Sequence, residues 1–402
     1  MIGRYGAWCL CLAYLLLAPL AARADASQWN AIVAKARGQV VNFNAWAGDE
    51  KINAFIAWTG AEVARRYGVT LRHVKLRDTA EAVTRVIAEK AAGRNADGTV
   101  DVIWINGPNL LALKEQRLLY GPFTAMLPND RYVDTTHIRS NVVDFTIPVD
   151  GYASPWRRAQ IVLIYDSRRV GDPPHSMVEL LAWAKEHPGR ATHPNVRNFL
   201  GATFLKQALY ELAPDAEALA APATEANFAA ITAPLWDWYD QLRPALWHHG
   251  DQFPDSGPAQ RQLMNDGEID LMISFNPAEA AVAEAAGQLP DSVRTIVFDR
   301  GTIGNTSFVA IPYNAAHKEG ALVVVNFLLE PATQARAQDY RQTGAFTVLD
   351  LDSLSSNDRK LFDRLPTHPA LPIDATLRTP LPEPHPSWMT RIAAQWERRY
   401  TK

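Results

Sequence analysis

Short apolar segments alternate with amphipathic segments of helical period along most of this 402-residue chain. Residues 40–43, 69–74 and 100–105 have the length and apolar pattern of strands, and the segments between them carry apolar side chains along one helical face. Strands and helices in alternation build a parallel sheet with helices on both faces. A second block of this kind covers residues 161–312, so we predict an α/β protein with two sheets.

The length of the chain also favours two units. Hydrophobic cores tend to split beyond about 250 to 300 residues, so we expect two lobes, each with a central, mostly parallel sheet flanked by helices. Hydrophobic residues make up 48% of the chain and charged residues 21%, as in a globular protein. The net charge is −3 and no long block of like charge occurs, so the sequence does not favour binding to nucleic acid or to a membrane surface.

The first 24 residues have the pattern of a secretory signal peptide. Arg4 precedes an apolar run at residues 7–20, and the Ala-Arg-Ala sequence at residues 22–24 fits the small residues that signal peptidase requires. The run is shorter than the ~20 apolar residues that span a membrane. Cleavage after Ala24 would remove two arginines and no acid, which takes the net charge from −3 to −5. We therefore expect export to the periplasm.

Both cysteines of the chain, Cys9 and Cys11, lie within this apolar run. The mature chain therefore has no disulfide, no thiolate metal ligand and no cysteine nucleophile. The adjacent His248 and His249 do not suggest a metal site either, because neighbouring residues rarely face one centre and no third ligand is suitably spaced. We expect no metal, no cofactor, and a stability that comes from a sizeable core.

Two apolar segments end in nearly the same way. Residues 98–108, GTVDVIWINGP, and residues 267–277, GEIDLMISFNP, both open with glycine, place an aspartate three residues later and break at an asparagine. Ligands of open parallel sheets bind beyond the carboxyl ends of the strands. Asn106 and Asn276 are therefore candidates to face one ligand from two sides, because an amide both donates and accepts hydrogen bonds. The alternative is that both sequences are ordinary turns.

The first strand leads into Asn-Ala-Trp-Ala-Gly-Asp at residues 44–49. Trp46 and Asn44 could offer a stacking face and a polar clamp to a flat or cationic ligand, and Gly48 would allow close approach of the backbone. Asp49 would add a carboxylate. The alternative is that Trp46 packs at the rim between the lobes and that Asp49 only caps the next helix.

Further candidates lie near the expected crossings between the lobes and at helix starts. Trp156 could close over a ligand, and Arg157 could bind a carboxylate or phosphate through two parallel hydrogen bonds. Helix N-termini attract anionic groups, and Ser256 stands at one such start, where it could equally be only a helix cap. The remaining candidates, near another helix start and after the second crossing, are Phe199, Thr203 and Asn305.

Four longer stretches resemble the extracytoplasmic substrate-binding proteins of ABC transporters. They are VVNFNAWAGDEKIN at residues 40–53, VDVIWINGPNLLALK at 100–114, IVLIYDSRRVGDPPHSMVELLAWAKEHPGRATHP at 161–194 and SFVAIPYNAAHKEGALVVVNFLLEPATQARAQ at 307–338. The spacing of Ile-Pro, Asn-Ala and Asn-Phe-Leu-Leu-x-Pro makes the fourth the most specific. Within the two-lobed class that includes thiamine-, polyamine- and ferric-iron-binding proteins, the chain most resembles the YnjB-type members.

The resemblance implies a type II periplasmic-binding-protein fold. Residues 38–150 and 305–402 would form the first lobe and residues 151–304 the second, with the ligand cleft between them. It also implies hinge strands near residues 147–153 and 297–304 and closure of the lobes around a solute. The solute would pass to a membrane permease that ATPase subunits drive. We expect such a protein to be a monomer without enzymatic activity.

The solute class is left open by the sequence. Trp46 and Trp156 with nearby carboxylates favour a cationic heteroaromatic such as thiamine, in agreement with the resemblance. Arg157 and the helix starts would instead favour an anion or a phosphate ester. Polyamine and metal are the further alternatives. Against polyamine, Asp-Arg-Gly-Thr at residues 299–302 stands where polyamine-binding relatives carry Pro-x-Glu-Gly.

An exported hydrolase on an α/β scaffold is the rival interpretation. The sequence has no GxSxG or HExxH motif to support one, and no P-loop GxxxxGK[ST] that would make this chain the ATPase. A sensor that binds the same kind of solute is a third interpretation. Sequence alone does not separate it from a transport component, whereas neighbouring permease and ATPase genes would.

Overall fold

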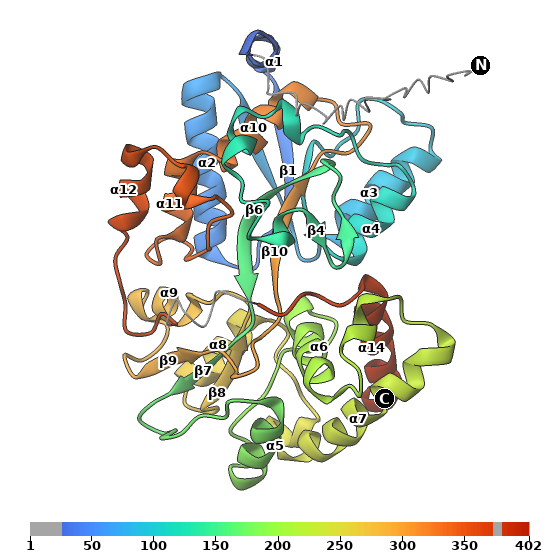
Figure 1. Ribbon diagram of the computed structural model, residues 1–402, viewed down its shortest axis with the longest axis vertical. Helices are drawn as coiled ribbons and strands as arrows, with labels where there is room; N and C mark the ends of the chain where they lie inside the picture. The colour runs from blue at the N-terminus through green and yellow to red at the C-terminus, as the bar shows by residue number, and fades with distance from the viewer. Residues whose placement is uncertain (1–25, 373–379, 402) are drawn as a thin grey trace, which may run out of the picture.

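The computed structural model describes residues 26–372 and 380–401, and the predicted signal peptide lies outside the described residues. The described chain forms two lobes that lie one above the other along the long axis of the molecule (Figure 1). Each lobe contains a sheet with helices packed on both faces. The predicted two-lobed α/β fold is therefore confirmed.

The sheet of the first lobe has five strands in the order β2-β1-β3-β10-β6. β1 is parallel to β2 and to β3, as the alternation of strands and helices predicts, whereas β10 is antiparallel to β3 and to β6. Two strands that come later in the chain thus complete a sheet begun by the N-terminal segments. The strands are β1 (Val40–Trp46), β2 (Thr70–Leu76), β3 (Val102–Ile105), β6 (Ala153–Gln160) and β10 (Gly304–Ala310).

Helices cover the two faces of this sheet in separate layers. Val41 and Phe43 of β1 pack with α2 and α10 on one face, and Ile103 and Ile105 of β3 pack with α3 and α4 on the other. This division follows from the period of two along a strand. The helices are α1 (Ala26–Ala36), α2 (Glu50–Tyr67), α3 (Ala80–Ala91), α4 (Pro108–Glu115), α10 (Lys318–Leu328), α11 (Pro331–Gln338) and α12 (Ser356–Asp363).

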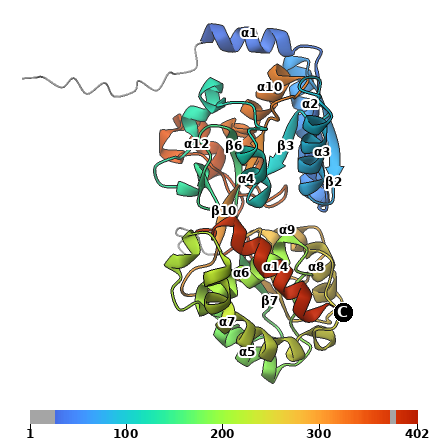
Figure 2. The same ribbon diagram turned by 90° about the vertical axis from the view of Figure 1, so that its right-hand side faces the viewer.

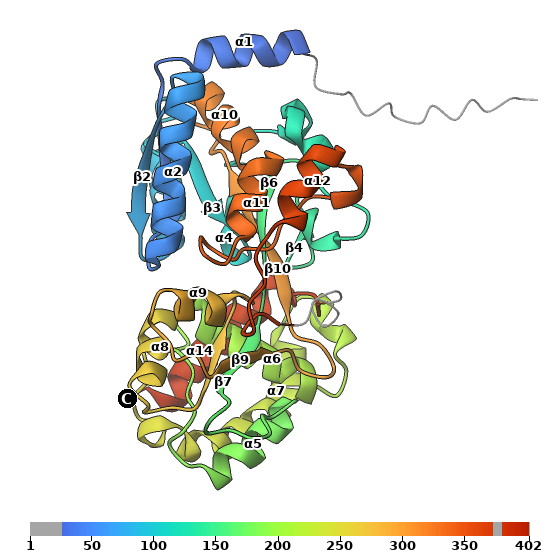
Figure 3. The same ribbon diagram turned by 90° about the vertical axis from the view of Figure 1, so that its left-hand side faces the viewer.

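α2 begins and ends where the sequence predicts, and Figure 3 shows it along the sheet of the first lobe. Asp49 caps its start by accepting a hydrogen bond from the Ile52 amide at 3.0 Å. Gly68 stops it by adopting a φ of 68°, the left-handed conformation that glycine takes without strain. The short pieces of this lobe are β4 (Val143–Asp144), β5 (Ile147–Pro148), η1 (Thr124–Met126), η2 (Pro128–Tyr132), η3 (Arg139–Asn141) and η7 (Leu351–Ser353).

The second lobe has a three-stranded sheet in the order β8-β7-β9, with the central β7 antiparallel to both neighbours. This pairing differs from the mostly parallel sheet that the sequence predicts for each lobe. The reason is that β7 continues the chain as it leaves the first lobe, whereas β8 and β9 each follow a helix and run back toward that lobe. The strands are β7 (Val162–Asp166), β8 (Leu271–Ser274) and β9 (Val293–Ile296).

Helices again pack on both faces of this sheet. Leu163 contributes to the core on the side of α5, α6 and α7, and its neighbour Ile164 to the core on the side of α8 and α9. The helices are α5 (Met177–Glu186), α6 (Phe199–Leu212), α7 (Glu225–Leu242), α8 (Gly257–Asn265), α9 (Glu279–Ala285) and α14 (Pro386–Tyr400), with the 3-10 turns η4 (Glu217–Ala220), η5 (Arg243–Ala245) and η6 (Trp247–Gly250).

Two neighbouring strands carry the chain between the lobes. β6 leads directly into β7, and β10 returns beside it, with the Ile161 amide donating to the Ile303 carbonyl at 2.8 Å where they cross. The first crossing thus lies later than the predicted residues 147–153, because residues 143–148 form the β4–β5 hairpin within the first lobe. The second crossing, at Ile303, lies inside the range 297–304.

A third segment passes between the lobes near the C-terminus. α12 packs on the first lobe, whereas α14 starts at the junction and runs down the second lobe beside α6 (Figure 2). Trp388, Ile392 and Trp396 of α14 are buried in the core of the second lobe. The expected first-lobe segment 305–402 therefore extends too far, because three large apolar side chains of its last helix are buried in the other lobe.

A buried ion pair fixes this third segment at the junction. The Lys206 ammonium of α6 lies 2.5 Å from the Glu383 carboxylate, and both side chains are almost fully buried. Asn305 of β10 donates a hydrogen bond to the same carboxylate at 2.8 Å. The ammonium also lies 4.5 Å from the ring centre of Phe145 and 5.0 Å from that of Phe199. One charged contact thus joins α6, β10 and the C-terminal segment.

Loss of one partner of this pair should destabilise the protein strongly. Lys206→Met leaves the Glu383 carboxylate buried without a counter-charge, so we expect urea unfolding to show a loss of about 3 to 5 kcal/mol. Adding Glu383→Gln should recover much of this loss, because it removes the unpaired charge. The exposed pair of Arg65 and Glu62 offers the control Glu62→Gln, which should leave unfolding almost unchanged. If Lys206→Met unfolds like the parent, the pair does not stabilise the junction.

Candidate ligand-binding cleft

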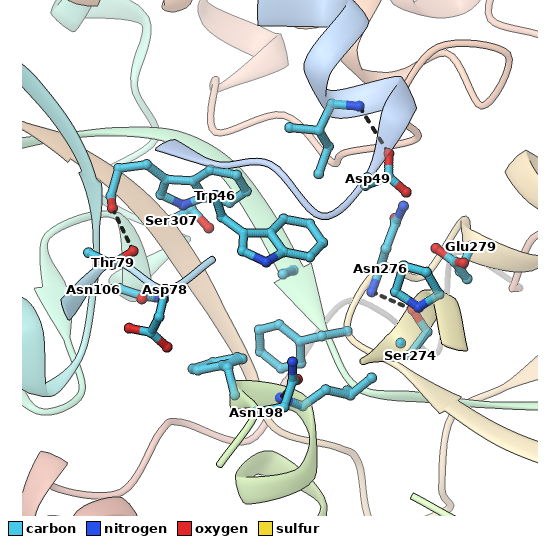
Figure 4. A pocket seen from close by; sticks show the side chains of 18 of the residues that line it. Trp46, Asp49, Asp78, Thr79, Asn106, Asn198, Ser274, Asn276, Glu279 and Ser307 are labelled. Atoms are coloured by element: carbon cyan, nitrogen blue, oxygen red, sulfur yellow. Dashed lines mark hydrogen bonds between the residues drawn. The ribbon is translucent and has the colours of Figure 1, made fainter. Parts of the chain in front are cut away.

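A cavity of about 390 Å³ lies between the two lobes, and residues of both lobes line it. This volume is within the range of small-molecule sites in proteins. The lining comes from the ends of β1, β3 and β8, from the starts of α2, α4, α6 and α8, and from the crossing strands β6 and β10 (Figure 4). Strand ends and helix starts therefore meet at this cavity, as at the ligand sites of other open α/β sheets.

Two tryptophans form the aromatic part of the first-lobe wall. Trp46 ends β1 and Trp104 lies in β3, and their rings meet edge to face with centres 6.4 Å apart. Gly48 leaves room for the Trp46 indole, because a Cβ at this position would lie within 2.3 Å of the ring. Asn106 follows β3 and lines the same cavity, and its side chain has no hydrogen-bond partner among the described residues.

The second lobe opposes these tryptophans with two phenylalanines. Phe199 is the first residue of α6 and Phe275 follows β8, and their rings meet edge to face with centres 5.3 Å apart. Asn198 lines the cavity beside them and caps α6 by accepting a hydrogen bond from the Leu200 amide at 2.9 Å. Four aromatic rings from two lobes thus surround a space that suits a flat solute.

A buried histidine and a helix glycine hold the loop before α6. The neutral His193 ring that fits its contacts donates from Nδ1 to the Pro194 carbonyl at 2.7 Å and accepts at Nε2 from the Tyr239 hydroxyl at 2.9 Å. Burial lowers the pKa of His193 to about 4. Gly201 lets this loop lie directly on α6, because a Cβ there would lie within 2.2 Å of the Pro194 carbonyl oxygen. Phe199 therefore starts from a well-defined position.

The crossing strand β6 places a guanidinium at the cavity. Arg157 is only 6% exposed, and its guanidinium lies 5.5 Å from the ring centre of Trp104 and 5.7 Å from that of Trp156. Burial lowers the pKa of Arg157 to about 10, and the carboxylates of Asp49 and Glu279 oppose this shift. Arg157 is therefore charged at neutral pH.

Arg261 of α8 lies near two carboxylates, one at the start of α2 and one at the start of α9. Its Nη1 lies 2.5 Å from Glu279 Oε1 in the same lobe and 4.0 Å from Asp49 Oδ2 in the first lobe. Burial raises the pKa of Glu279, and the charge of Arg261 opposes that rise. Because the contact of Asp49 with Arg261 spans the two lobes, it favours an arrangement in which the lobes are close together.

Six of the residues predicted from the sequence line this cavity, and their part in binding remains a prediction. They are Trp46, Asp49, Asn106, Arg157, Phe199 and Asn276. The Asn276 amide is engaged within the protein, since its Nδ2 donates to the Thr343 carbonyl at 2.9 Å and its Oδ1 accepts from the Ala278 amide at 3.2 Å. Turn chemistry thus accounts for the contacts of Asn276, whereas the side-chain amide of Asn106 is unpaired within the part of the chain that the structure describes.

Two predicted residues belong to helix starts but lie outside the lining. Thr203 is fully buried one turn below Phe199, and its hydroxyl donates to the Phe199 carbonyl at 2.8 Å. Ser256 caps α8 by accepting a hydrogen bond from the Ala259 amide at 3.3 Å, so the cap alternative describes it. The two residues that follow Ser256 line the cavity in its place.

Three further predicted residues are buried behind the cavity. The Asn44 side chain faces the interior of the first lobe, where its Oδ1 accepts from Arg85 at 3.4 Å. Trp156 packs in the core with its ring centre 5.0 Å from that of Trp104. Asn305 is held by Glu383 at the junction. The period of two along a strand explains Trp156, because its neighbour Arg157 lines the cavity from the opposite face of β6. Asn44 is on the same face of β1 as Trp46 but lies two residues before the end of the strand.

Several lining residues are absent from the prediction, chiefly Trp104, Arg261 and Glu279. Trp104 lies within an apolar run, where core packing is the ordinary interpretation. Arg261 is in the interior of α8 and has no local signal. Glu279 follows the Asn-Pro turn at the start of α9, and that position could have indicated it. Within residues 26–372 and 380–401, no three side chains of His, Cys, Asp or Glu are grouped to hold a metal ion, and no helix is long and apolar enough to cross a membrane.

Residues 58–361 match the family described as bacterial extracellular solute-binding protein. The chain belongs to this family. It is also 41% identical over 387 residues to Protein YnjB of Escherichia coli strain K12, which covers 96% of this chain and 97% of the relative. The resemblance predicted from the sequence is therefore confirmed. Membership of the family implies a small-molecule ligand, a site of action outside the cytoplasm, and the permease and ATPase of an ABC transporter as partners.

Two solved structures from similar solute-binding proteins share the fold. One is AfuA, the periplasmic binding protein of Actinobacillus pleuropneumoniae, with fructose-6-phosphate bound. It has a TM-score of 0.63 at 14% identity, and the match covers 90% of this chain and 98% of AfuA. Iron-bound HitA of Pseudomonas aeruginosa has a TM-score of 0.61 at 16% identity, and the match covers 90% of this chain and 99% of HitA. One fold thus holds a sugar phosphate in one protein and iron in another, so the fold alone does not identify the solute.

Acid should weaken the second lobe through His193. The folded-state pKa of about 4 lies below the 6.5 of an unperturbed histidine, so the stability contributed by the neutral ring is complete above pH 6.5 and is lost as the pH falls toward 4. The shift corresponds to about 3 kcal/mol. In urea titrations between pH 7 and 4, the unfolding free energy of His193→Gln should fall less than that of the parent. His137→Gln, at an exposed histidine, should follow the parent. Equal slopes for all three proteins would contradict this assignment.

The contact of Asp49 with Arg261 should shift the balance between closed and open lobes. Asp49→Asn keeps the helix cap, because Asn caps as well as Asp, but removes the charge that faces Arg261. Since the mature chain has no cysteine, spin labels can be placed at Thr84→Cys on α3 and Asn265→Cys on α8. In the solute-free protein we expect pulsed EPR to show longer distances for Asp49→Asn than for the parent, with unchanged stability. The same distances in both would show that this contact does not affect closure.

Proposed function

We propose that this chain is the periplasmic binding component of an ABC importer and that it captures a small solute with a flat ring. The observation that supports this most directly is the set of four aromatic rings, Trp46, Trp104, Phe199 and Phe275, that line one cavity from two lobes. Aromatic side chains favour flat rings through stacking, and they attract cations through their faces. Closure of the lobes would exclude water from both sides of such a ring.

The first candidate is a cationic heteroaromatic solute such as thiamine. The carboxylates of Asp49, Asp78 and Glu279 line the cavity near the rings and can lower the energy of a positive ring. Asn106 adds an amide that is free to orient the ring through its donors and its acceptor. These groups can distinguish solutes because a wrong solute would leave buried polar groups unpaired.

The chain would carry out no chemistry of its own. No histidine or cysteine is found among the lining residues that the structure describes, so Ser274 and Ser307 lack at the cavity the histidine base of a typical serine hydrolase. We propose that the protein acts as a monomer after removal of residues 1–24 in the periplasm, and that the closed form docks on the permease. Its specificity then rests on the cleft alone.

Thermal unfolding of residues 25–402 tests this function. The protein is refolded from denaturant to remove bound solute and is then heated with thiamine, its phosphates, polyamines, amino acids, sugars, oxyanions or metal ions. A solute at 100 times its dissociation constant should add about 2.7 kcal/mol of stability. A clear rise in Tm from a ring compound supports the proposal. A rise in Tm with polyamines or metal ions alone would contradict the proposed ring solute and would indicate another solute class.

Removal of the Trp46 ring should weaken binding of the stabilising ring compound by about 1 to 3 kcal/mol without affecting the fold. Gly48→Ala should act in the same direction, because the new Cβ displaces the Trp46 indole. Trp183→Ala is the matched control, since this ring stacks on His187 far from the cavity. Titration calorimetry with the three variants measures the effect. If Trp46→Ala binds as tightly as Trp183→Ala, Trp46 takes no part in the site.

A further inference from the structure

Among the described arginines that line the cavity, Arg77 is exposed, whereas Arg157 is both buried and unpaired. Its side chain is 94% buried, and among the described residues its guanidinium has neither a hydrogen-bond acceptor nor a carboxylate within ion-pair distance. Arg261 is paired with Glu279, and the exposed Arg197 with Glu397 at 2.6 Å. The adjacent Arg158 donates from its Nε to the Thr347 carbonyl at 2.7 Å. A buried cation without a partner costs free energy, so its retention at the cavity calls for an explanation.

The surroundings of Arg157 keep its guanidinium in one place. The rings of Trp104 and Trp156 contact it by cation–π attraction, and neither ring supplies a hydrogen-bond acceptor for its N–H groups. Ser307, the partner of Arg157 in the pairing of β6 with β10, lines the cavity beside it. Both residues lie on the paired strands that join the lobes, so the donors are fixed before a solute arrives.

The electrostatic setting of the cavity favours negative charge. Five basic and three acidic residues line it, a formal excess of two positive charges in a chain whose net charge is −3. Two of the acids, Asp49 and Glu279, already face Arg261. Five helices of eight or more residues, α2, α3, α4, α6 and α8, also begin at the lining, and the partial positive charge at a helix start favours an anion. The excess of positive charge and the helix starts therefore add to the attraction of Arg157 for an anion.

We propose that the solute carries an anionic group, a phosphate or a carboxylate, and that Arg157 binds this group at the crossing strands while the aromatic rings hold the rest of the solute. This inference rests on the proposed capture of a ring compound and narrows it. A guanidinium presents two parallel N–H donors that match two oxygens of such an anion. The solute class is then a heteroaromatic compound with an acidic substituent, for which thiamine monophosphate is a suitable probe.

The test compares probes that differ only in the anionic group. Titration calorimetry at constant ionic strength compares thiamine with thiamine monophosphate and pyridoxine with pyridoxine 5′-phosphate, which test a phosphate. Nicotinamide compared with nicotinate tests a carboxylate. Inorganic phosphate alone is the fourth probe. We expect at least one anionic member to bind about tenfold or more tightly than its neutral or cationic parent, a difference of about 1.4 kcal/mol, because hydrogen bonds between charged groups are stronger than those between neutral groups.

Variants at two arginines assign this preference to a residue. Arg157→Gln should abolish the preference for the anionic member, and Arg157→Lys should retain part of it, because the charge remains and the paired donors are lost. Arg197→Gln removes an exposed guanidinium from the same cavity and should keep the preference within about twofold. Circular dichroism and binding of the parent compound show whether each variant is folded. If Arg157→Gln does not fold, the lysine variant decides the comparison with Arg197→Gln.

The outcomes separate this inference from the proposed function. If parent and anionic compounds bind equally well, or if Arg157→Gln keeps the preference, the inference is wrong while ring capture stands. If no ring compound binds but inorganic phosphate raises the Tm in a way that requires Arg157, the anion site is supported and ring capture is wrong. If neither ring compounds nor phosphate affect the protein, both are overturned.

Discussion

The antiparallel contact of β6 with β10, where the chain passes between the lobes, is the constraint on which the rest of this structure depends. The two strands complete the first sheet and continue into the second lobe, with Ile161 hydrogen-bonded to Ile303 at the crossing. Because both lobes are attached to the same pair of strands, the cavity opens where these strands leave the first sheet. Arg157 and Ser307 line it from those strands, so the strands that join the lobes form part of the wall of the cavity.

Buried charge is treated differently at the junction and at the cavity. At the junction, Lys206 is neutralised by Glu383 and further enclosed by two aromatic rings, a closed arrangement that ties three segments together. At the cavity, Arg157 is almost equally buried, but among the described residues its guanidinium contacts two aromatic rings and has no hydrogen-bond acceptor or paired carboxylate. The charge of Lys206 is already paired within the protein, whereas the guanidinium of Arg157 keeps N–H donors to which an anionic group can bind. The same kind of residue therefore serves structure in one place and recognition in the other.

Sequence reasoning located the strand ends of the cleft better than the individual side chains. Trp46, Asn106 and Asn276 follow strands whose ends the apolar pattern predicts, and all three line the cavity. Asn44 and Trp156, which the sequence also suggests, are buried instead. Trp156 is on the opposite face of β6 from its neighbour Arg157, whereas Asn44 shares a face of β1 with Trp46 but lies two residues before the end of the strand. The pattern alone shows neither which face meets the other lobe nor how far the cavity extends along a strand. Arg261 has no local signal, since its place at the cavity depends on how α8 packs against the second sheet.

By itself the sequence determined that the chain is α/β, that it forms two lobes, that its family is one of solute-binding proteins, and that Asp49 starts a helix. The fold class and the helix start depend on local periodicity and on caps, the two lobes on the length of the chain, and the family on the resemblance of four stretches of sequence. Only the tertiary structure decided that α14 returns to the second lobe, that Arg261 lies between Glu279 and Asp49, and that Arg157 is buried without a partner among residues 26–372 and 380–401. Each of these depends on contacts between residues far apart in the chain, and burial, which sets the energy of a charge, exists only once those contacts have formed.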